Sequence, residues 1–270
     1  MSNSKYQEMA QGEQNIINLF VHKTTAERYA KSRPFFHPLV IKRIREFTGR
    51  ENFKHALDVG CGTGQSTTAL LEIAERAVGI DISAEMLSQV PKDSRLQFYQ
   101  SPAETFPFEN AAFDLITVGL AFHWFEREKF LSEARRVLQP NCWLVIYNNW
   151  FASEMKENPD FKRWCREEHF KRYPSPPRNY EPLTKEQAEQ FGFDFVAEEN
   201  FENELVMTRE NLRDYLMTQT NVIAKPEEGN ESFEDTARWI DESTSELFTG
   251  EKRTFLFGGV IWFLGKKVSN

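Results

Sequence analysis

A glycine-rich turn directly after a short apolar run is the feature that most limits what this chain can fold into. The run starts at Ala56 and contains the acid Asp58, and glycines follow at Gly60, Gly62 and Gly64. A segment with helical spacing then covers residues 65–76. A glycine has no Cβ, so the backbone can turn sharply there and a ligand can approach it closely. This order predicts a strand, a tight turn and a helix N-terminus, with which α/β sheets bind nucleotide-like ligands.

Apolar runs and helical segments alternate through the first 150 residues. Strands are expected at about 55–59, 77–81, 96–100, 113–119 and 142–147, and helices at about 38–49, 65–76, around Met86 and at 126–138. Ser83 has the residue type and position to cap the third of these helices. The alternation predicts an α/β fold with a doubly wound, mostly parallel seven-stranded sheet and helices on both faces.

After residue 148 this rhythm changes to a stretch rich in aromatic residues, charges and prolines. Helices are expected at about 159–170, 184–191, 209–219 and 233–248, one or two strands at 193–207, and a last strand at 253–264. Gly258 and Gly259 predict a bulge in the last strand. We expect one domain over residues 1–270, with its core at about 35–150. Residues 151–270 would supply a helical and loop cap, inserted after the fifth strand, and the last strands of the sheet.

Composition and charge exclude several classes of protein. The net charge is −8 without a long Lys/Arg run, which argues against a nucleic-acid partner. The three cysteines lack metal-ligand spacing, and we expect no metal. The N-terminus has no signal-peptide core, and the most apolar run, 255–265, is too short to span a bilayer, so a cytoplasmic protein is expected. The 24 Phe, 7 Tyr and 6 Trp suit an aromatic-lined pocket.

The spacing of the glycines separates two classes of cofactor. A dinucleotide site needs G-x-G-x-x-G, but Gln65 stands where the third glycine would be. The pattern D-x-G-x-G-x-G resembles the cofactor motif of class I S-adenosylmethionine-dependent methyltransferases. The resemblance implies that Asp58, Gly60 and Gly62 contribute to binding S-adenosylmethionine. A tight turn without a ligand remains the alternative interpretation of this stretch.

A second acid, Asp81, closes the second expected strand about twenty residues beyond the first. An acid at this place can accept hydrogen bonds from both ribose hydroxyls of an adenosine. Asp81 as a helix N-cap is the alternative, although Ser83 is available for that role. Ile82 and Met86 would then flank the adenine, while Met86 is equally suited to the core.

The third loop, 101–108, resembles the adenine-binding loop of the same family, although Pro102 occupies the usual aspartate position. The resemblance implies that the Ala103 backbone amide serves a ring nitrogen, and that Glu104 or a backbone carbonyl serves the adenine amino group. The end of the fourth strand would place the backbone of Gly119 and Leu120 beside the methionine half of the cofactor.

His123 is the titratable side chain just beyond that strand, and it is the candidate general base. A packed or helix-capping histidine is the alternative. Upstream, residues 29–36 resemble a segment that folds over the cofactor in small-molecule members, which implies Tyr29 as a contact and Arg33 as the partner of the methionine carboxylate. An ordinary surface arginine is the alternative for Arg33. Aromatic residues suited to line a cap are Trp150, Phe151, Trp164, Tyr173 and Tyr180, together with Phe122 and Trp124.

Taken with the resemblance, these features predict methyl transfer to the oxygen or carbon of a small molecule, as in enzymes similar to trans-aconitate and quinone-type methyltransferases. The acceptor and the oligomeric state do not follow from the sequence. Two other classes stay open: a binding protein that holds S-adenosylmethionine without turnover, and a nicotinamide-dependent oxidoreductase on a similar sheet.

Overall fold

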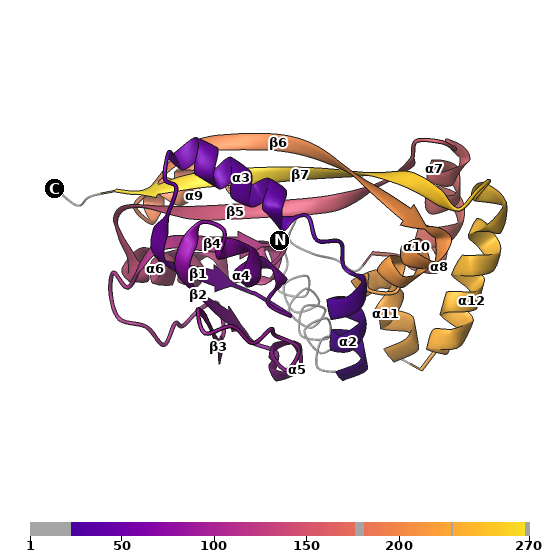
Figure 1. Cartoon of the computed structure of the whole chain (residues 1–270), viewed down its shortest axis with the longest axis horizontal. Helices are drawn as coiled ribbons and strands as arrows, with labels where there is room; N and C mark the ends of the chain where they lie inside the picture. The colour runs from indigo at the N-terminus through magenta and orange to yellow at the C-terminus, as the bar shows by residue number, and fades with distance from the viewer. Residues whose placement is uncertain (1–22, 176–180, 228, 268–270) are drawn as a thin grey trace, which may run out of the picture. The chain divides into compact units, whose positions relative to one another are not determined.

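The computed structural model describes residues 23–175, 181–227 and 229–267 (Figure 1). A seven-stranded sheet runs in the order β3-β2-β1-β4-β5-β7-β6. The strands are β1 Phe53–Val59, β2 Ala74–Asp81, β3 Leu96–Gln100, β4 Phe113–Gly119, β5 Leu138–Met155, β6 Phe193–Thr208 and β7 Lys252–Lys266. The pairs β1–β2, β1–β4, β2–β3 and β4–β5 are parallel. The strand order reverses direction between β1 and β4, which is where sheets of this kind bind ligands.

The chain divides into two compact units. The core unit contains residues 35–149, 179–201 and 259–270, and the second unit contains residues 1–34, 150–178 and 202–258. Three of the boundaries between the units fall within β5, β6 and β7, and the other two follow residues 34 and 178.

Both faces of the sheet are covered in the core unit. Its helices are α3 His37–Thr48, α4 Gln65–Leu70, α5 Ala84–Leu87, the 3-10 turn η2 Phe122–Trp124, α6 Arg127–Val137 and α9 Lys185–Gln190. Along β5, Leu144 and Ile146 pack in the same apolar cluster as α6, whereas Val145 and Tyr147 pack in the cluster that contains residues of α3 and α4. This alternation between two buried faces confirms the expected doubly wound architecture.

The second unit is mainly helical and has its own apolar core. It contains α2 Lys23–Ser32, α7 Asp160–Trp164, the π-helical turn η3 Cys165–His169, α8 Phe170–Arg172, α10 Arg209–Leu216, α11 Thr220–Glu227, α12 Phe233–Thr244 and the 3-10 turn η4 Ser245–Leu247. Large side chains fill its core, among them Phe161, Trp164, Tyr173, Tyr215 and Phe255. None of the helices within residues 23–267, apart from the gaps given above, combines the length and apolar character that a membrane span requires.

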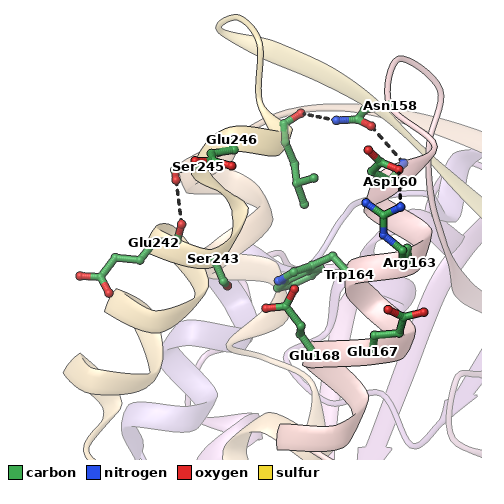
Figure 2. Close-up of a pocket in the computed structure, with 11 residues that line it drawn as sticks. Asn158, Asp160, Arg163, Trp164, Glu167, Glu168, Glu242, Ser243, Ser245 and Glu246 are labelled. Carbon is green, nitrogen blue, oxygen red and sulfur yellow. Dashed lines mark hydrogen bonds and ion pairs between the residues drawn. The ribbon is translucent and has the colours of Figure 1, made fainter.

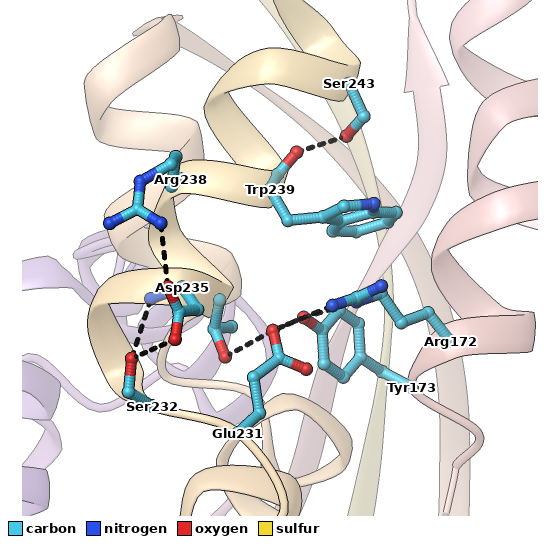
Figure 3. Close-up of polar contacts among 9 residues, drawn as sticks. Arg172, Tyr173, Glu231, Ser232, Asp235, Arg238, Trp239 and Ser243 are labelled. Atoms are coloured by element: carbon cyan, nitrogen blue, oxygen red, sulfur yellow. Dashed lines mark hydrogen bonds and ion pairs between the residues drawn. The ribbon is translucent and has the colours of Figure 1, made fainter.

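A carboxylate fastens two of these helices to each other (Figure 3). One oxygen of Glu231 accepts hydrogen bonds from Arg172 at 3.0 Å, from the Tyr173 hydroxyl at 3.1 Å and from the Thr236 hydroxyl at 3.1 Å. The Arg172 guanidinium also lies 4.9 Å from the centre of the Trp239 ring. Burial acts to raise the pKa of Glu231, but these hydrogen bonds outweigh it and hold the pKa below its usual value. The ionised carboxylate therefore links the end of α8 to α12.

Two expected elements differ from the structure. The helix expected over 65–76 ends at Leu70, and β2 begins at Ala74 instead of residue 77. Ala74 pairs with Phe53 of β1, so pairing with the sheet overrides the local helical pattern of this stretch. The helix α11, which carries Pro226, lies where no helix was expected. The other expected helices and strands are present, with ends shifted by a few residues, and β5 extends eight residues further, to Met155.

The strand β7 is continuous from Lys252 to Lys266, so its two central glycines do not interrupt it, and the expected bulge stays a prediction. A Cβ on Gly258 would lie 2.8 Å from the Trp150 ring, and one on Gly259 would lie 2.1 Å from the Phe201 ring. Aromatic rings therefore pack directly on the backbone of this strand, and glycine leaves them the space.

Replacement of Gly259 with alanine is expected to lower the free energy of unfolding by about 1–3 kcal/mol, the usual cost of overpacking. The reason is that the Phe201 ring must move to admit a methyl group. Gly265→Ala is the matched control in the same strand, because its new Cβ would meet nothing closer than Val196 at 3.7 Å. Urea denaturation measures both, and equal stabilities of the two variants would contradict the packing argument.

Candidate cofactor site

The turn after β1 has the backbone conformation that its glycines suggested. Gly60, Gly62 and Gly64 have φ values of 73°, 55° and 78°, in the left-handed region that side chains disfavour. A Cβ on Gly60 would lie 2.5 Å from the Cβ of Ala121, just beyond β4. The turn therefore packs against the end of β4 with no room for a side chain.

Asp58 is fully buried beneath this turn. Its carboxylate accepts hydrogen bonds from the hydroxyls of Ser66 at 2.6 Å, Thr67 at 2.7 Å and Thr117 at 3.1 Å. Burial raises its pKa, although the three hydroxyls act in the opposite direction. Because no atom of Asp58 reaches the surface, we expect it to act on a ligand through the turn and not by direct contact, which differs from its predicted role as a cofactor contact.

Asp81 connects the turn to the end of β2. One carboxylate oxygen accepts the backbone N–H of Gly62 at 2.8 Å, and the other accepts the backbone N–H of Ser83 at 2.9 Å. Ser83 caps α5, as expected, through a bond from the backbone N–H of Met86 to its hydroxyl at 3.1 Å. Asp81 is therefore not the helix cap. Burial raises its pKa above the usual value, although the backbone N–H groups that it accepts oppose this effect.

Ile82 and Met86 differ in how much surface they offer. The Ile82 side chain is 52% exposed, which is unusual for a large apolar residue and leaves an apolar surface beside Asp81. Met86 is buried, and its Cε lies 3.2 Å from the position that a Cβ on Gly62 would take. Ile82 is therefore placed to cover a flat apolar ring, whereas Met86 packs against the turn.

The loop after β3 lies beside the same acid. The backbone N–H of Ser101 donates to the backbone carbonyl of Asp81 at 3.0 Å, and Ala103 is buried. One carboxylate oxygen of Glu104 accepts the backbone N–H of Glu126, at the start of α6, at 2.9 Å. That oxygen is therefore engaged in the protein, and the adenine contact of Glu104 stays a prediction.

Two residues near the end of β4, Tyr147 and His37, were not predicted from the sequence to belong to the site. Gly119 is paired with Tyr147 of β5, and the backbone N–H of Leu120 donates to the Tyr147 carbonyl at 3.0 Å. Leu120 has φ 59°, a conformation that is uncommon outside glycine and concentrates at functional sites. The Tyr147 hydroxyl lies 3.0 Å from Nδ1 of His37, which is 110 positions away in the sequence. No local motif links these two residues, so no sequence signal identifies the pair.

His123 lies on the 3-10 turn η2, directly after this end of β4, and its ring centre is 4.5 Å from that of Trp124. Its part in proton transfer stays a prediction.

Tyr29 and Arg33 belong to the second unit, so their predicted contact with a cofactor also stays a prediction. Within that unit the Arg33 guanidinium donates to the carbonyl of Thr218 at 3.0 Å and lies 4.7 Å from the centre of the Tyr29 ring.

The aromatic residues proposed for a cap differ in how much of each is exposed to solvent. Trp164 and Tyr173 are buried, Trp150 is 47% exposed, and Tyr180 lies outside the described residues. Trp164 lines a cavity of about 450 Å³ in the second unit (Figure 2). The charged residues around this cavity are mostly acidic: Asp160, Glu167, Glu168, Glu242 and Glu246, with Arg163 as the cation. Arg163 pairs with Asp160 at 3.2 Å, so the lining favours a cation over an acid.

The residues of the core unit fit an adenosine-like ligand. A turn of glycines in the left-handed conformation, an acid bonded to that turn and an exposed apolar side chain lie at the carboxyl ends of β1 and β2. In the described part of the chain, no group of three or more His, Cys, Asp or Glu side chains is arranged to hold a metal ion.

Known proteins that are similar to this chain are methyltransferases. Residues 57–146 match a family described as a methyltransferase domain. A Dictyostelium discoideum protein assigned as a methyltransferase is 32% identical over 93 residues, which make up 34% of this chain and 35% of that protein. The malonyl-[acyl-carrier protein] O-methyltransferase of Porphyromonas gingivalis is 24% identical over 254 residues, covering 89% of this chain and 94% of that protein. The chain thus spans about a third of the first relative and nearly all of the second.

A solved structure has the same fold. It comes from an Anaeromyxobacter dehalogenans protein assigned as a type II methyltransferase, with a TM-score of 0.66 and 20% identity, and it covers 85% of this chain and 95% of that chain.

Proposed function

We propose, from the premise that residues 57–146 of this chain belong to the methyltransferase family, that the protein transfers a methyl group from S-adenosylmethionine to a small-molecule acceptor by in-line displacement. The acceptor atom is an oxygen or a carbon. The relative that covers most of the chain is named for O-methylation of a malonyl group on a carrier protein, which supports an acidic oxygen as the acceptor.

One observation supports the proposal more than any other. The carboxylate of Asp81 bonds to the backbone N–H of Gly62 at 2.8 Å, so the acid that ends β2 and the glycine turn that follows β1 form one structure. The two features were predicted separately, from the glycine spacing and from the acid about twenty residues further on. The bond between them joins the turn and the acid at the carboxyl ends of two neighbouring strands, where sheets of this kind bind ligands.

Each proposed contact has a defined role in binding. When bound, S-adenosylmethionine supplies an electrophilic methyl group on a positively charged sulfur. The backbone of Gly60 and Gly62 accommodates a close approach, Asp81 accepts the ribose hydroxyls, and Ile82 covers the adenine. The remaining proposed contacts are Tyr29, Arg33, Met86, Ala103, Glu104, Gly119 and Leu120, with Asp58 supporting the turn.

Positioning is the main contribution of the protein to the reaction. Holding two reactants in line contributes up to about 7–11 kcal/mol. A general base such as His123 would add about 10²–10⁴-fold for an acceptor that must lose a proton. An acceptor that is already ionised, such as a carboxylate, would gain nothing from that base.

Calorimetry on the purified chain tests the proposal, with S-adenosylhomocysteine and NAD⁺ as ligands. We expect binding of S-adenosylhomocysteine and none of NAD⁺; the reverse result would favour a nicotinamide-dependent oxidoreductase. Transfer of a labelled methyl group is then measured with a panel of small carboxylic acids, a malonyl thioester, phenols and quinones. Binding without transfer to any of them would favour the alternative of a catalytically silent binding protein.

A further inference from the structure

A buried pair of titratable rings lies in the core unit and has no part in the proposed function so far. Nδ1 of His37, at the first position of α3, lies 3.0 Å from the hydroxyl of Tyr147 in β5. The two residues are only 6% and 4% exposed. The ring of Phe36 stacks on His37 at 4.6 Å, so the pair lies in an apolar environment. Burial lowers the pKa of His37 to about 4, and its imidazole is therefore neutral at neutral pH.

The pair of His37 and Tyr147 lies beside the end of β4. Tyr147 is the residue of β5 that pairs with Gly119, the last residue of β4. The Tyr147 side chain lies against the end of β4: a Cβ added to Gly119 would be only 2.5 Å from the Tyr147 hydroxyl oxygen. The phenol group therefore occupies the place of the missing side chain at position 119. Any other residue there would displace it.

The same tyrosine also holds the backbone beyond Gly119. The carbonyl of Tyr147 accepts the N–H of Leu120, whose φ of 59° is costly for a residue with a side chain. Backbone strain of this kind persists only where the surroundings impose it. Tyr147 thus contributes its main chain and its side chain to the two residues proposed to border the methionine half of the cofactor.

We infer that His37 and Tyr147 form a neutral positioning pair, which holds the phenol oxygen of Tyr147 beside Gly119 as an electronegative group for the positively charged sulfur of S-adenosylmethionine. The inference rests on the proposed function and deepens it, because it assigns residues that favour the charged cofactor over its neutral product.

The chemistry of the two side chains supports this role. With the imidazole proton on Nε2, Nδ1 accepts the Tyr147 O–H, and the negative end of the hydroxyl dipole is left on its oxygen. A neutral imidazole adds no positive charge near a cation, whereas an imidazolium, a lysine or an arginine at position 37 would repel it. The pair transfers no proton in this role. It acts only by orienting a dipole in a site of low dielectric, where such a dipole has its greatest effect.

The test compares the affinities of one protein for two ligands that differ in charge. Dissociation constants for S-adenosylmethionine and S-adenosylhomocysteine are measured by calorimetry on the whole chain, for the wild type and for Tyr147→Phe. We expect the variant to bind S-adenosylmethionine about five- to tenfold more weakly, the scale of one ordinary hydrogen-bonding group, and to bind the neutral product less than about twofold more weakly. The ratio of the two constants is the readout, and it does not depend on turnover.

Two further variants make the comparison specific. Tyr99→Phe removes the same atom from an exposed tyrosine of β3 and should leave both affinities unchanged. His37→Leu removes the acceptor of the phenol proton and should shift the ratio in the direction of Tyr147→Phe, whereas His37→Gln, which keeps an acceptor, should restore it in part. If thermal unfolding shows that Tyr147→Phe does not fold, the ratio of the two constants is measured with the His37 variants instead.

An equal loss of affinity for both ligands in Tyr147→Phe and His37→Leu would overturn the inference, since it would show a role in supporting the site alone. An unchanged ratio with unchanged affinities would overturn it as well. If the wild-type chain binds neither ligand, the proposed function itself fails, and this outcome differs from both of the others.

Discussion

Replacing Asp58 with alanine is expected to reduce the free energy of unfolding by about 3–5 kcal/mol, because three buried hydroxyl groups lose the acceptor that they share. The carboxylate is fully buried and accepts hydrogen bonds from Ser66, Thr67 and Thr117. Without it, three hydroxyl groups of the protein interior lose their acceptor, and each unsatisfied group costs about 1–3 kcal/mol. Because these hydroxyls belong to the first turn of α4 and to β4, the loss should loosen the glycine turn between them.

Urea denaturation of the whole chain checks this expectation, with two comparison variants. Asp58→Asn keeps one acceptor oxygen and should give an intermediate loss. Asp93→Ala removes the same charge from an exposed acid whose partner is Arg95, and it should change stability by less than about 0.5 kcal/mol. A loss below about 1 kcal/mol in Asp58→Ala would show that the three hydroxyls find other acceptors, and that Asp58 does not hold the turn.

The parts of the fold that sequence patterns predict well are those in which local and tertiary preferences agree. The bounds of β3 and β4 match the expectation residue for residue. Turn-forming residues lie on both sides of β3, at Asp93-Ser94 and Ser101-Pro102, and β4 ends at Gly119. The helix expected over 65–76 fails in its second half, where Ala74 and its neighbours pair with β1 instead. Helical spacing on the sequence does not reveal that a strand is available for pairing.

The candidate site shows the same division. Residues of the glycine turn, Asp81 and Ser83 lie within a short stretch, and their spacing alone indicates a strand, a turn and a capped helix. The partners of Asp58 include Thr117, which lies 59 positions further on, and the pair of His37 and Tyr147 is separated by 110 positions. Those contacts depend on which strands are neighbours and in which register, and this information is absent from the local pattern.

Replacing Asp81 with alanine is expected to weaken the binding of S-adenosylhomocysteine more than tenfold while the fold is retained. The carboxylate is the group proposed to accept both ribose hydroxyls, and two such hydrogen bonds to a charged acceptor are worth about 1.5–3 kcal/mol each. The carboxylate also accepts the backbone N–H groups of Gly62 and Ser83, so its removal takes away the bond that ties the glycine turn to the end of β2. Although burial raises the pKa of Asp81, part of the residue stays accessible to solvent, so water can replace the carboxylate for these two donors and the cost to stability should stay small.

A second ligand separates direct contact with the ribose from an effect on the turn. The 2′-deoxy counterpart of S-adenosylhomocysteine lacks one of the hydroxyls, so it should bind the wild type more weakly but lose less than the parent ligand when Asp81 is replaced. Asp93→Ala, an equal change of charge at an exposed position, should leave both constants within about twofold of the wild type, the range of weak surface electrostatics. If Asp81→Ala weakens the two ligands by the same factor, the acid makes no contact with the 2′-hydroxyl, and the proposed bonds to both ribose hydroxyls are wrong. If it weakens neither, Asp81 has no part in the site, and the glycine turn alone would have to account for any binding.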